Sequence, residues 1–521
     1  MHRRSLFAAL FFTIFLAACG GSSTITPPPP AGGFSNSSLN GQYAFSMSGQ
    51  DLDGGYIAHA GTFVADGNGA ITAGIEDVVD GNSPASEITF SGGSYSIQKN
   101  GTGSLILQGA TGGGLQVSVV LLSSSQGTLI QTDLNASGSG SFALQTPSQF
   151  SATLLTGNFV LDFYGVSFAG AMPVPLSIIG QVVLDGNGNV PRGTIDENNG
   201  TASGPIAAQA GTYQIDTSGN GGNFGRGTIS FGGRNFVFYI VNSTRIKVIE
   251  EDIGAATVGD AILQSANIPA QNSAFTGSFV YLVQGASVLG SQGAISRVAR
   301  FTADGNGGIA AISYDENNNG NHLHISQGSN ISNATYAIDT AHAGTGRGTF
   351  TFKESSAGTY TYIFYLQSPT LAVIQDTSPG IVADGPMQQQ TGAPFTNAGL
   401  AGNYAFNWNG LFLGTQNTIP VDEDYVGQYV LASAASSNIT GSMDYTQLGL
   451  SGQNFFINIG LAGGLTVNTD GTNNNALKLV DGGSPSTTYN FALYVVNPNT
   501  SFMVCIDGTR TTAGMASQQS Q

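Results

Sequence analysis

Hydrophobic and polar residues alternate with a period of two along most of the chain after residue 38. Short runs of this kind, such as residues 60–65 and 70–75, flank the tetrad Asp-Gly-Asn-Gly at 66–69. Such alternation is typical of half-buried strands, and Gly and Asn accept the positive φ angles that a tight hairpin turn requires. The pattern therefore predicts β-hairpins rather than helices.

The strand pattern occurs four times in the chain. Each copy opens with a Gly-x-aromatic phrase, in which the glycine is Gly41, Gly157, Gly277 or Gly402. Three copies then carry the turn tetrad, which begins at Asp66, Asp185 and Asp304, and the fourth copy lacks it. Each copy closes near a glutamine, at Gln145, Gln264, Gln388 and Gln518. Repetition of this kind indicates tandem modules that share one scaffold.

Each copy holds about eight strand-like runs separated by turn residues. Eight successive antiparallel strands favour an up-and-down β-barrel, which leaves no exposed sheet edge, over a β-sandwich. The predicted fold is therefore all-β, with modules at 39–146, 153–265, 274–389 and 398–518, of which the last diverges most. The opening phrase and the regular meander resemble lipocalin and avidin barrels, although no copy has the Trp usual in lipocalin openings and the single Trp is Trp408.

The first residues have the three parts of an export signal. Arg3 and Arg4 precede an apolar run at 6–16, which is too short to span a bilayer as a helix. Small residues then lead to a cysteine in Leu16-Ala17-Ala18-Cys19. This tetrapeptide resembles the bacterial lipobox, and the resemblance implies a signal peptide at 1–18 and lipid attachment at Cys19. Gly20 in place of Asp favours the outer membrane by resemblance to the enterobacterial sorting pattern.

Residues 19–38 are rich in Gly, Ser and Pro and predict a flexible tether. The phrases G-x-Y-x-F and D-G-N-G resemble those of Gly-rich tandem-repeat envelope lipoproteins, which implies an envelope location and no particular mechanism. We expect the membrane to be reached through the lipid on Cys19, because no later stretch is apolar enough to cross it as a helix.

Charge excludes one class of function. The chain has 14 Lys and Arg against 31 Asp and Glu, a formal net charge of −17. Such a surface repels phosphate backbones, so we do not expect nucleic-acid binding. The second cysteine, Cys505, lies in an apolar run without a partner for a disulfide. We expect a buried, inert thiol there.

Two sets of recurring aspartates are the main candidate site residues. In the first set, each aspartate of the first three copies comes eleven residues after the start of the turn tetrad. In the second set, each aspartate ends a late strand pair. The two sets are Asp77, Asp196, Asp315 and Asp444, and Asp133, Asp252, Asp376 and Asp507. Two carboxylates in each module could act as acid and base in glycoside hydrolysis. The favoured interpretation is structural, with each carboxylate capping a turn through backbone N–H groups.

One loop has part of a calcium-binding pattern. Asp315, Asn317 and Asn319, followed by Gly320, alternate as oxygen ligands do, but Ser326 stands where a bidentate Glu is required. A polar turn is favoured over a metal site. His322 and His324 share a strand face without a third recurring ligand, and an exposed pair is favoured over a metal centre.

The sequence predicts no cofactor and no catalytic constellation. The leading hypothesis is a membrane-anchored, non-enzymatic binding or adhesion protein whose partner is a glycan or another envelope component. A small-ligand carrier that uses barrel cavities and a carboxylate-dependent hydrolase stay open as alternatives. The sequence does not determine the oligomeric state.

Overall fold

The computed structural model describes residues 33–110, 114–134, 136–146, 150–170, 172–217, 219–289, 293–326, 331–355, 358–414, 420–432, 437–449, 452–483 and 485–520. The signal peptide, Cys19 and most of the predicted tether lie outside these residues. The described chain forms four antiparallel sheets in sequence order, which we call modules 1 to 4. The all-β class and the tandem antiparallel modules predicted from the sequence are confirmed.

Modules 1 and 4 are closed barrels of eight strands in up-and-down order. The strands of module 1 are β1 (Asn40–Asp51), β2 (Tyr56–Asp66), β3 (Ala70–Asp80), β4 (Ser86–Ile97), β5 (Thr102–Gly109), β6 (Gly114–Ser123), β7 (Gln126–Gln131) and β8 (Ala136–Leu144). Those of module 4 are β28 (Gly402–Phe412), β29 (Val421–Leu431), β30 (Asn438–Gly449), β31 (Gly452–Leu465), β32 (Thr472–Asp481), β33 (Thr488–Asn497), β34 (Thr500–Cys505) and β35 (Arg510–Gln518).

Modules 2 and 3 have the same strand order, but in each of them the strand that corresponds to β4 is split into two pieces. Their ladders stay open at that break, whereas those of modules 1 and 4 close into the barrels that the sequence favours. Module 2 contains β9 (Thr156–Ser167), β10 (Val174–Asp185), β11 (Asn189–Val190), β12 (Gly193–Asn198), β13 (Ala202–Ala208), β14 (Gly211–Ile215), α1 (Gly219–Asn223), β15 (Arg226–Phe231), β16 (Arg234–Asn242), β17 (Arg245–Glu250) and β18 (Ala255–Leu263). Module 3 contains β19 (Thr276–Ser287), β20 (Gly293–Asp304), β21 (Ile309–Asn318), β22 (Asn321–Ile325), β23 (Ile331–Ile338), β24 (Arg347–Glu354), β25 (Gly358–Ser368), β26 (Leu371–Asp376) and β27 (Ile381–Gln389).

A short 3-10 turn precedes each module: η1 (Asn36–Ser38), η2 (Ala152–Leu154), η3 (Asn272–Ala274) and η4 (Asn397–Leu400). Phe34, just before η1, is 5 % exposed and packs in the core of module 1. Residues 33–38 therefore lie against the first barrel, which differs from the expectation that they belong to a flexible tether. The aromatic Phe34 supplies apolar area that the Gly- and Pro-rich composition of the segment obscured.

The Asp-Gly-Asn-Gly tetrads form the tight turns that the sequence predicts. In the first, Asp66 Oδ1 accepts hydrogen bonds from the backbone N–H groups of Asn68 and Ala70, at 2.7 and 2.9 Å. Gly67 and Gly69 have φ angles of 78° and 110°, which disfavour a side chain. These hydrogen bonds lower the pKa of the exposed Asp66 carboxyl.

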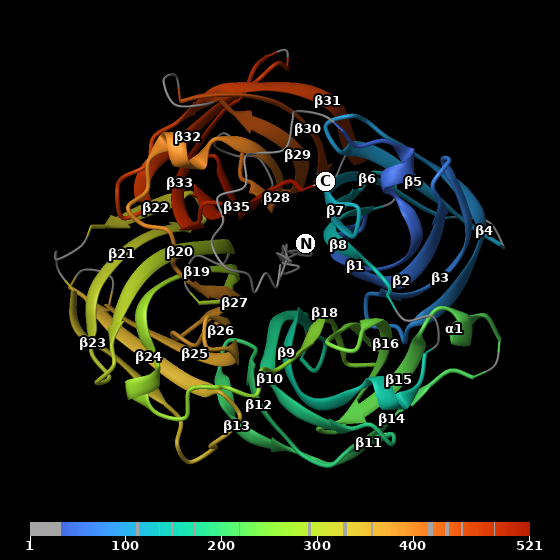
Figure 1. Cartoon of the computed structure of the whole chain (residues 1–521), viewed down its shortest axis with the longest axis horizontal. Coiled ribbons are helices and arrows are strands. Elements are labelled where there is room, and N and C mark those ends of the chain that lie inside the picture. Colours follow the sequence, from blue (N-terminus) through green and yellow to red (C-terminus); the bar gives the residue numbers. More distant parts are fainter. Residues whose placement is uncertain are drawn as a thin grey trace, which may run out of the picture.

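The four modules stand around a common centre, and the first and last modules lie side by side (Figure 1). Each module ends in a glutamine whose side-chain amide donates to two backbone carbonyls of the next module. The pairs are Gln145 to Phe224 and Ile240, Gln264 to Thr345 and Leu366, Gln390 to Asp470 and Val495, and Gln519 to Asn100 and Leu121. The last pair joins module 4 to module 1 and closes the ring. The closing residues of modules 3 and 4 are thus Gln390 and Gln519, not Gln388 and Gln518 as the sequence suggested.

Apolar clusters lie between the modules as well as inside them. Module 1 meets module 2 through side chains such as Ala58, Val79 and Val237, and modules 1, 3 and 4 share a cluster that includes Val120 and Val504. The modules are therefore packed against one another through the outer faces of their sheets. We call the four interfaces seams 1–2, 2–3, 3–4 and 4–1.

Candidate functional site

Two of the recurring aspartates lie in a clamp between neighbouring modules. Asp77 on β3 accepts Nε and Nη2 of Arg226 in module 2, both at 2.8 Å, and the hydroxyl of Tyr239 at 2.6 Å. Asp196 on β12 accepts Nε and Nη2 of Arg347 in module 3 at 2.8 and 2.9 Å, and Tyr365 at 2.7 Å.

The aspartates therefore have a structural role in the seams. Their partners are side chains of the next module, whereas the sequence suggested the backbone of their own turns. Bidentate Arg–carboxylate pairs of this kind are among the strong hydrogen-bonded contacts in proteins.

The third seam uses a different set of donors. Asp315 on β21 accepts the hydroxyl of Tyr494 at 2.7 Å, but Thr472 stands opposite Tyr494 where the other seams have Arg. His322 and His324 of the same hairpin fill this gap, with ring nitrogens 2.8 and 3.0 Å from Asp315 Oδ1. The hydrogen bond to Asp315 raises the pKa of His324. The histidine pair is thus part of a seam.

The residues of the predicted calcium loop are used in the same seam. The Asn317 amide donates to the carbonyls of Cys505 and Arg510 at 2.7 and 2.8 Å, and its oxygen accepts the N–H of Gly320 at 2.9 Å. Asn319 lies in the turn with a φ angle of 50°. In the part of the chain that the structure describes, no group of three or more His, Cys, Asp or Glu side chains is placed to hold a metal ion.

The fourth aspartate of the set, Asp444 on β30, lies in seam 4–1. Its Oδ1 accepts the backbone N–H of Asn458 at 2.6 Å. A groove of about 870 Å³ opens beside it, between β5 and β6 of module 1 and the β30–β31 hairpin. Burial raises the pKa of the Asp444 carboxyl.

The late aspartates fall into two structural positions. Asp252 accepts the backbone N–H and the side-chain amide of Asn235, at 2.6 and 2.8 Å, and Asp507 accepts the same two groups of Asn490, at 2.9 and 2.7 Å. Both carboxylates therefore cap the start of a neighbouring strand. Asp133 lies at the equivalent place in module 1 and accepts the amide of Gln131 at 2.9 Å.

Asp376 also accepts a backbone N–H, that of Ser378 at 2.9 Å, but it lies at a different position in its module from these three. It lies opposite Tyr362 in the ladder, as Glu250 lies opposite Phe236 in module 2. Ser378 takes the capping position and accepts the N–H of Thr361 at 3.1 Å. The sequence grouped Asp376 by its place after an apolar run, which did not show that it lies two residues before the capping position held by Ser378.

A carboxylate pairs with a basic side chain inside one end of every module. His59 pairs with Glu76 in module 1 at 3.0 Å, and Arg510 with Glu423 in module 4 at 3.3 Å. In module 3, Arg297 pairs with Glu316 at 2.8 Å and with Asp376. Sequence reasoning missed these pairs because their members lie in different strands and share no motif.

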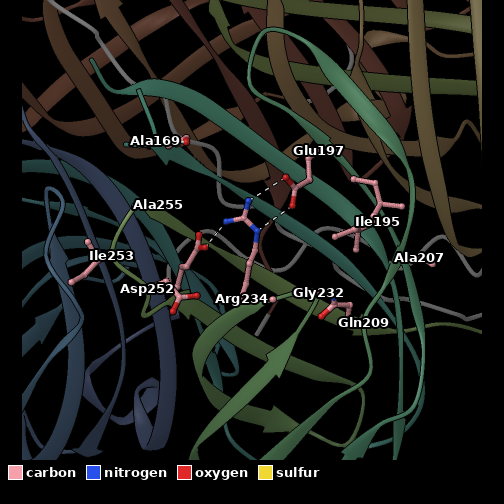
Figure 2. A pocket seen from close by; sticks show the side chains of 15 residues that line it. Ala169, Ile195, Glu197, Ala207, Gln209, Gly232, Arg234, Asp252, Ile253 and Ala255 are labelled. Atoms are coloured by element: carbon pink, nitrogen blue, oxygen red, sulfur yellow. Dashed lines mark hydrogen bonds and ion pairs between the residues drawn. The ribbon is translucent and has the colours of Figure 1, made fainter. Parts of the chain in front are cut away.

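The ion pair of module 2 lies in a wide hollow at the mouth of the sheet. Arg234 donates Nε and Nη2 to the two oxygens of Glu197, at 3.1 and 3.2 Å, and Nη1 to Glu250 at 2.6 Å. The hollow has a volume of about 660 Å³. Figure 2 shows Arg234 reaching toward Glu197, with Gln209 and Ile253 on opposite sides. Burial raises the pKa of Glu250, against the effect of Arg234.

This hollow combines charged side chains with exposed isoleucines. Ile206 and Ile253 are 42 % and 70 % exposed at its rim, where they cannot contribute to the core. Exposed aliphatic side chains next to converging polar groups are typical of ligand-binding clefts. The hollow is therefore one candidate site, and the groove of seam 4–1 is another.

The interiors of the modules are filled by side chains. Each contains an apolar cluster in its described residues, and that of module 3 includes eleven buried Phe and Tyr side chains. A cavity inside module 2, beside Phe163 and Phe231, has a volume of about 10 Å³. Such a space holds no more than about one water molecule.

Several ionisable groups are buried where two modules meet. Lys247 donates to the hydroxyls of Ser46 and Ser141 in module 1, at 3.0 and 2.8 Å, and to Asp260 at 3.2 Å. Burial lowers the pKa of Lys247 to about 8. Burial also raises the pKa values of Asp162 and Asp384, and each of the two carboxyls of this seam 2–3 pair disfavours charge on the other.

Cys505 is buried at the end of β34 and carries no disulfide. Burial raises the pKa of its thiol, which disfavours the reactive thiolate. Among the described residues, no helix combines the length and apolar character that crossing a bilayer requires.

The chain matches no protein-family model. The search of curated proteins also gave no match. Among solved structures, a single-site mutant of the vaccine antigen transferrin binding protein B from Haemophilus parasuis Hp5 is similar at 9% identity, with a TM-score of 0.13. The similarity covers 76% of this chain and 83% of that protein. No conclusion about function rests on this distant similarity.

Proposed function

We propose that the protein is a lipid-anchored, non-enzymatic binding protein of the bacterial cell envelope, with the outer membrane favoured. The export signal and the lipobox at Cys19 support the anchor, and several acyl chains hold a protein to a membrane where one chain holds it only marginally. The ring of four packed modules is then a rigid body that presents its mouths and seams to partners.

The observation that carries the binding role is the hollow at the mouth of module 2. A volume of about 660 Å³ is in the range of small-ligand sites. Carboxylate, amide and backbone groups of Glu197, Gln209 and Gly232 line it beside exposed isoleucines. This mixture of hydrogen-bonding groups and apolar surface suits a hydroxyl-rich ligand such as an envelope glycan.

Two alternative functions receive less support. A carrier that stores its ligand inside a barrel needs interior space, and the interiors are filled by apolar side chains. A hydrolase needs a carboxylate free to exchange protons with a substrate. Both oxygens of Glu197 accept from Arg234, and those of Glu250 accept from Arg234 and from Thr257 at 2.8 Å.

Glycan arrays probed with the full chain in detergent test this proposal, and calorimetric titration then measures the affinity for each sugar that is retained. We expect Gln209→Ala and Ile253→Ser to weaken binding about tenfold, because each removes a rim contact. Leu134→Ser is the matched control, since Leu134 follows Asp133 as Ile253 follows Asp252 and is 72 % exposed. Equal binding by all three variants, or no glycan retained on the array, would overturn the proposal.

The membrane anchor has a separate test. Palmitate labelling of cells that express the protein should mark the wild type and not Cys19→Ser, and fractionation should place the labelled protein with the outer membrane. Labelling that persists in Cys19→Ser would show that the anchor has been assigned to the wrong residue.

A further inference from the structure

The groove of seam 4–1 lies where the other seams have a clamp. In modules 2 and 3, the arginine of the clamp is the first residue of its strand, β15 or β24, and lies opposite the tyrosine of the clamp on the next strand. These pairs are Arg226 with Tyr239 and Arg347 with Tyr365. The same register in module 1 pairs Thr102 with Val120. Module 1 therefore offers neither a guanidinium nor a phenol to Asp444.

The residue that braces each clamp arginine is also different in module 1. Asp216 and Asp339 accept Nη1 of Arg226 and Arg347, at 2.8 and 2.9 Å. Each also donates its backbone N–H to the carbonyl of its arginine, and in module 1 the residue with this backbone contact is Gln98, bonded to Thr102. Gln98, Thr102 and Asp444 all line the groove, so the groove occupies the space of the missing clamp.

Asp444 has the acceptor capacity that the clamp would use. The carboxyl accepts the backbone N–H of Asn458 through Oδ1 and a hydrogen bond from the side chain of Ser118 in module 1, but in the described residues no Lys or Arg lies within ion-pair distance of it. Asp77 and Asp196, the equivalent residues, each accept two guanidinium N–H groups. The molecule thus shows twice, in its own seams, which chemical group fits this carboxylate.

The other wall of the groove is a sheet edge. β31 pairs with β30 from Gly452 to Gly464, but its pairs with β32 within the described chain cover Leu461–Leu465. In the stretch at 455–459, the backbone groups that face away from β30 are therefore available for another strand, except the N–H of Asn458, which donates to Asp444. Phe455 and Ile457 line the groove and are 37 % and 61 % exposed. Phe456, on the opposite face, stacks on Tyr445 with ring centroids 4.4 Å apart.

We propose that this groove binds an extended segment of a partner protein that carries an arginine. The guanidinium pairs with Asp444, the segment's backbone adds to the free edge of β31, and its alternate apolar side chains contact Phe455 and Ile457. A basic partner also complements the formal net charge of −17. This proposal is independent of glycan binding, because the groove lies between modules 4 and 1 and the proposed glycan site lies in module 2.

The test uses the full chain in detergent and a fluorescein-labelled heptapeptide of alternating Thr and Val with Arg at its centre. The second probe is the same peptide with citrulline, which keeps the shape of arginine but carries no charge. Fluorescence anisotropy should show binding of the Arg peptide and at least about tenfold weaker binding of the citrulline peptide, because charge-assisted bidentate pairs are lost. Equal affinities for the two peptides, or no binding of either, would overturn the proposal.

Three variants locate the site. Asp444→Asn should lower the affinity for the Arg peptide to that for the citrulline peptide. Thr102→Arg should abolish binding, because it supplies the missing guanidinium from within the chain. Asp53→Asn removes the same charge from an exposed turn of module 1 and should leave the affinity unchanged. An equal loss in Asp53→Asn and Asp444→Asn would indicate general attraction to an acidic surface and would contradict the assigned site.

Thermal unfolding separates a binding effect from a folding effect. Thr102→Arg should unfold at the same temperature as the wild type or higher, because the new arginine adds an ion pair with Asp444 to seam 4–1 and breaks no existing ion pair. If Thr102→Arg unfolds earlier and also loses binding, Asp444→Asn decides, because it should lose the Arg peptide and unfold at the same temperature as the wild type.

Discussion

Replacing the clamp arginine of seam 2–3 should cost a large part of the stability of the ring. Arg347→Met keeps most of the side-chain volume and removes two hydrogen bonds to Asp196, of 2.8 and 2.9 Å. The carboxylate of Asp196 is 0 % exposed and retains only the hydroxyl of Tyr365 among these partners. The change therefore leaves a buried charge that is poorly compensated.

Removing one partner of a buried ion pair costs about 3–5 kcal/mol. We expect a value near the lower end, about 3 kcal/mol, because Tyr365 still donates a hydrogen bond to the charged group. The double variant Arg347→Met with Asp196→Asn should be more stable than Arg347→Met alone, by about 1–2 kcal/mol, since no charge is then buried without its partner.

Urea unfolding followed by far-UV circular dichroism and by tryptophan fluorescence measures both quantities. Trp408, the only tryptophan, is buried in module 4, so its signal reports whether damage at seam 2–3 reaches a distant module. Arg192→Met, at an exposed arginine of module 2, is the control and should shift the free energy by less than about 0.5 kcal/mol. The reasoning is refuted if Arg347→Met behaves like this control or if the double variant is no more stable than the single one.

Three further outcomes follow from the seams. Burial raises the pKa of Asp384 to about 8, so the folded protein keeps a proton there that the unfolded chain releases above about 3.9, and stability falls as pH rises from that value; Asp384→Asn should therefore raise the melting temperature at pH 8 and give no gain near pH 4. Because the pKa of His324 is raised, its stabilising contact with Asp315 is complete below about 6.5 and disappears as pH rises through the folded pKa; the fall in melting temperature between pH 6 and 8.5 should therefore be smaller in His324→Ala, as calorimetry can show. Gln519→Ala removes two hydrogen bonds across seam 4–1 and should destabilise the protein by about 1–3 kcal/mol in urea unfolding, whereas an unchanged midpoint would show that the ring does not need this contact.

The local structure could be predicted from the sequence because it depends on neighbouring residues. The period of two gives strands, and the tetrad at Asp66 gives a turn whose partners lie within four residues of it. The recurring aspartates were also visible, but not their partners. Asp77 and Arg226 are separated by 149 residues, and nothing in the pattern of either module indicates that the two meet. Asp376 ends its strand as the sequence indicated and accepts the backbone N–H of Ser378, but only its ladder partner Tyr362 shows that it occupies the place of Glu250 in module 2.

The candidate sites depend on differences between modules, which a repeat pattern conceals. Phe236 pairs with Glu250 in module 2, and Tyr362 pairs with Asp376 at the same place in module 3. Two residues before these, module 2 has Arg234 where module 3 has Tyr360. Similarly, Thr102 is an ordinary strand residue until its register with Arg226 and Arg347 is known. Alignment of the four copies by structure therefore reveals sites that alignment by phrase did not.

Seam 4–1 shows that closing the ring and clamping a seam are separate tasks. Gln519 and the backbone N–H of Ser520 contact module 1 as Gln145 and Thr146 contact module 2, so the closing contacts are present in all four seams. Apolar packing around Val120 and Val504 adds the burial that holds module 4 against module 1. The seam is thus closed without a clamp, and its carboxylate at Asp444 is available to a ligand. Because closure does not depend on Asp444, a variant there should lose the ligand and keep the ring.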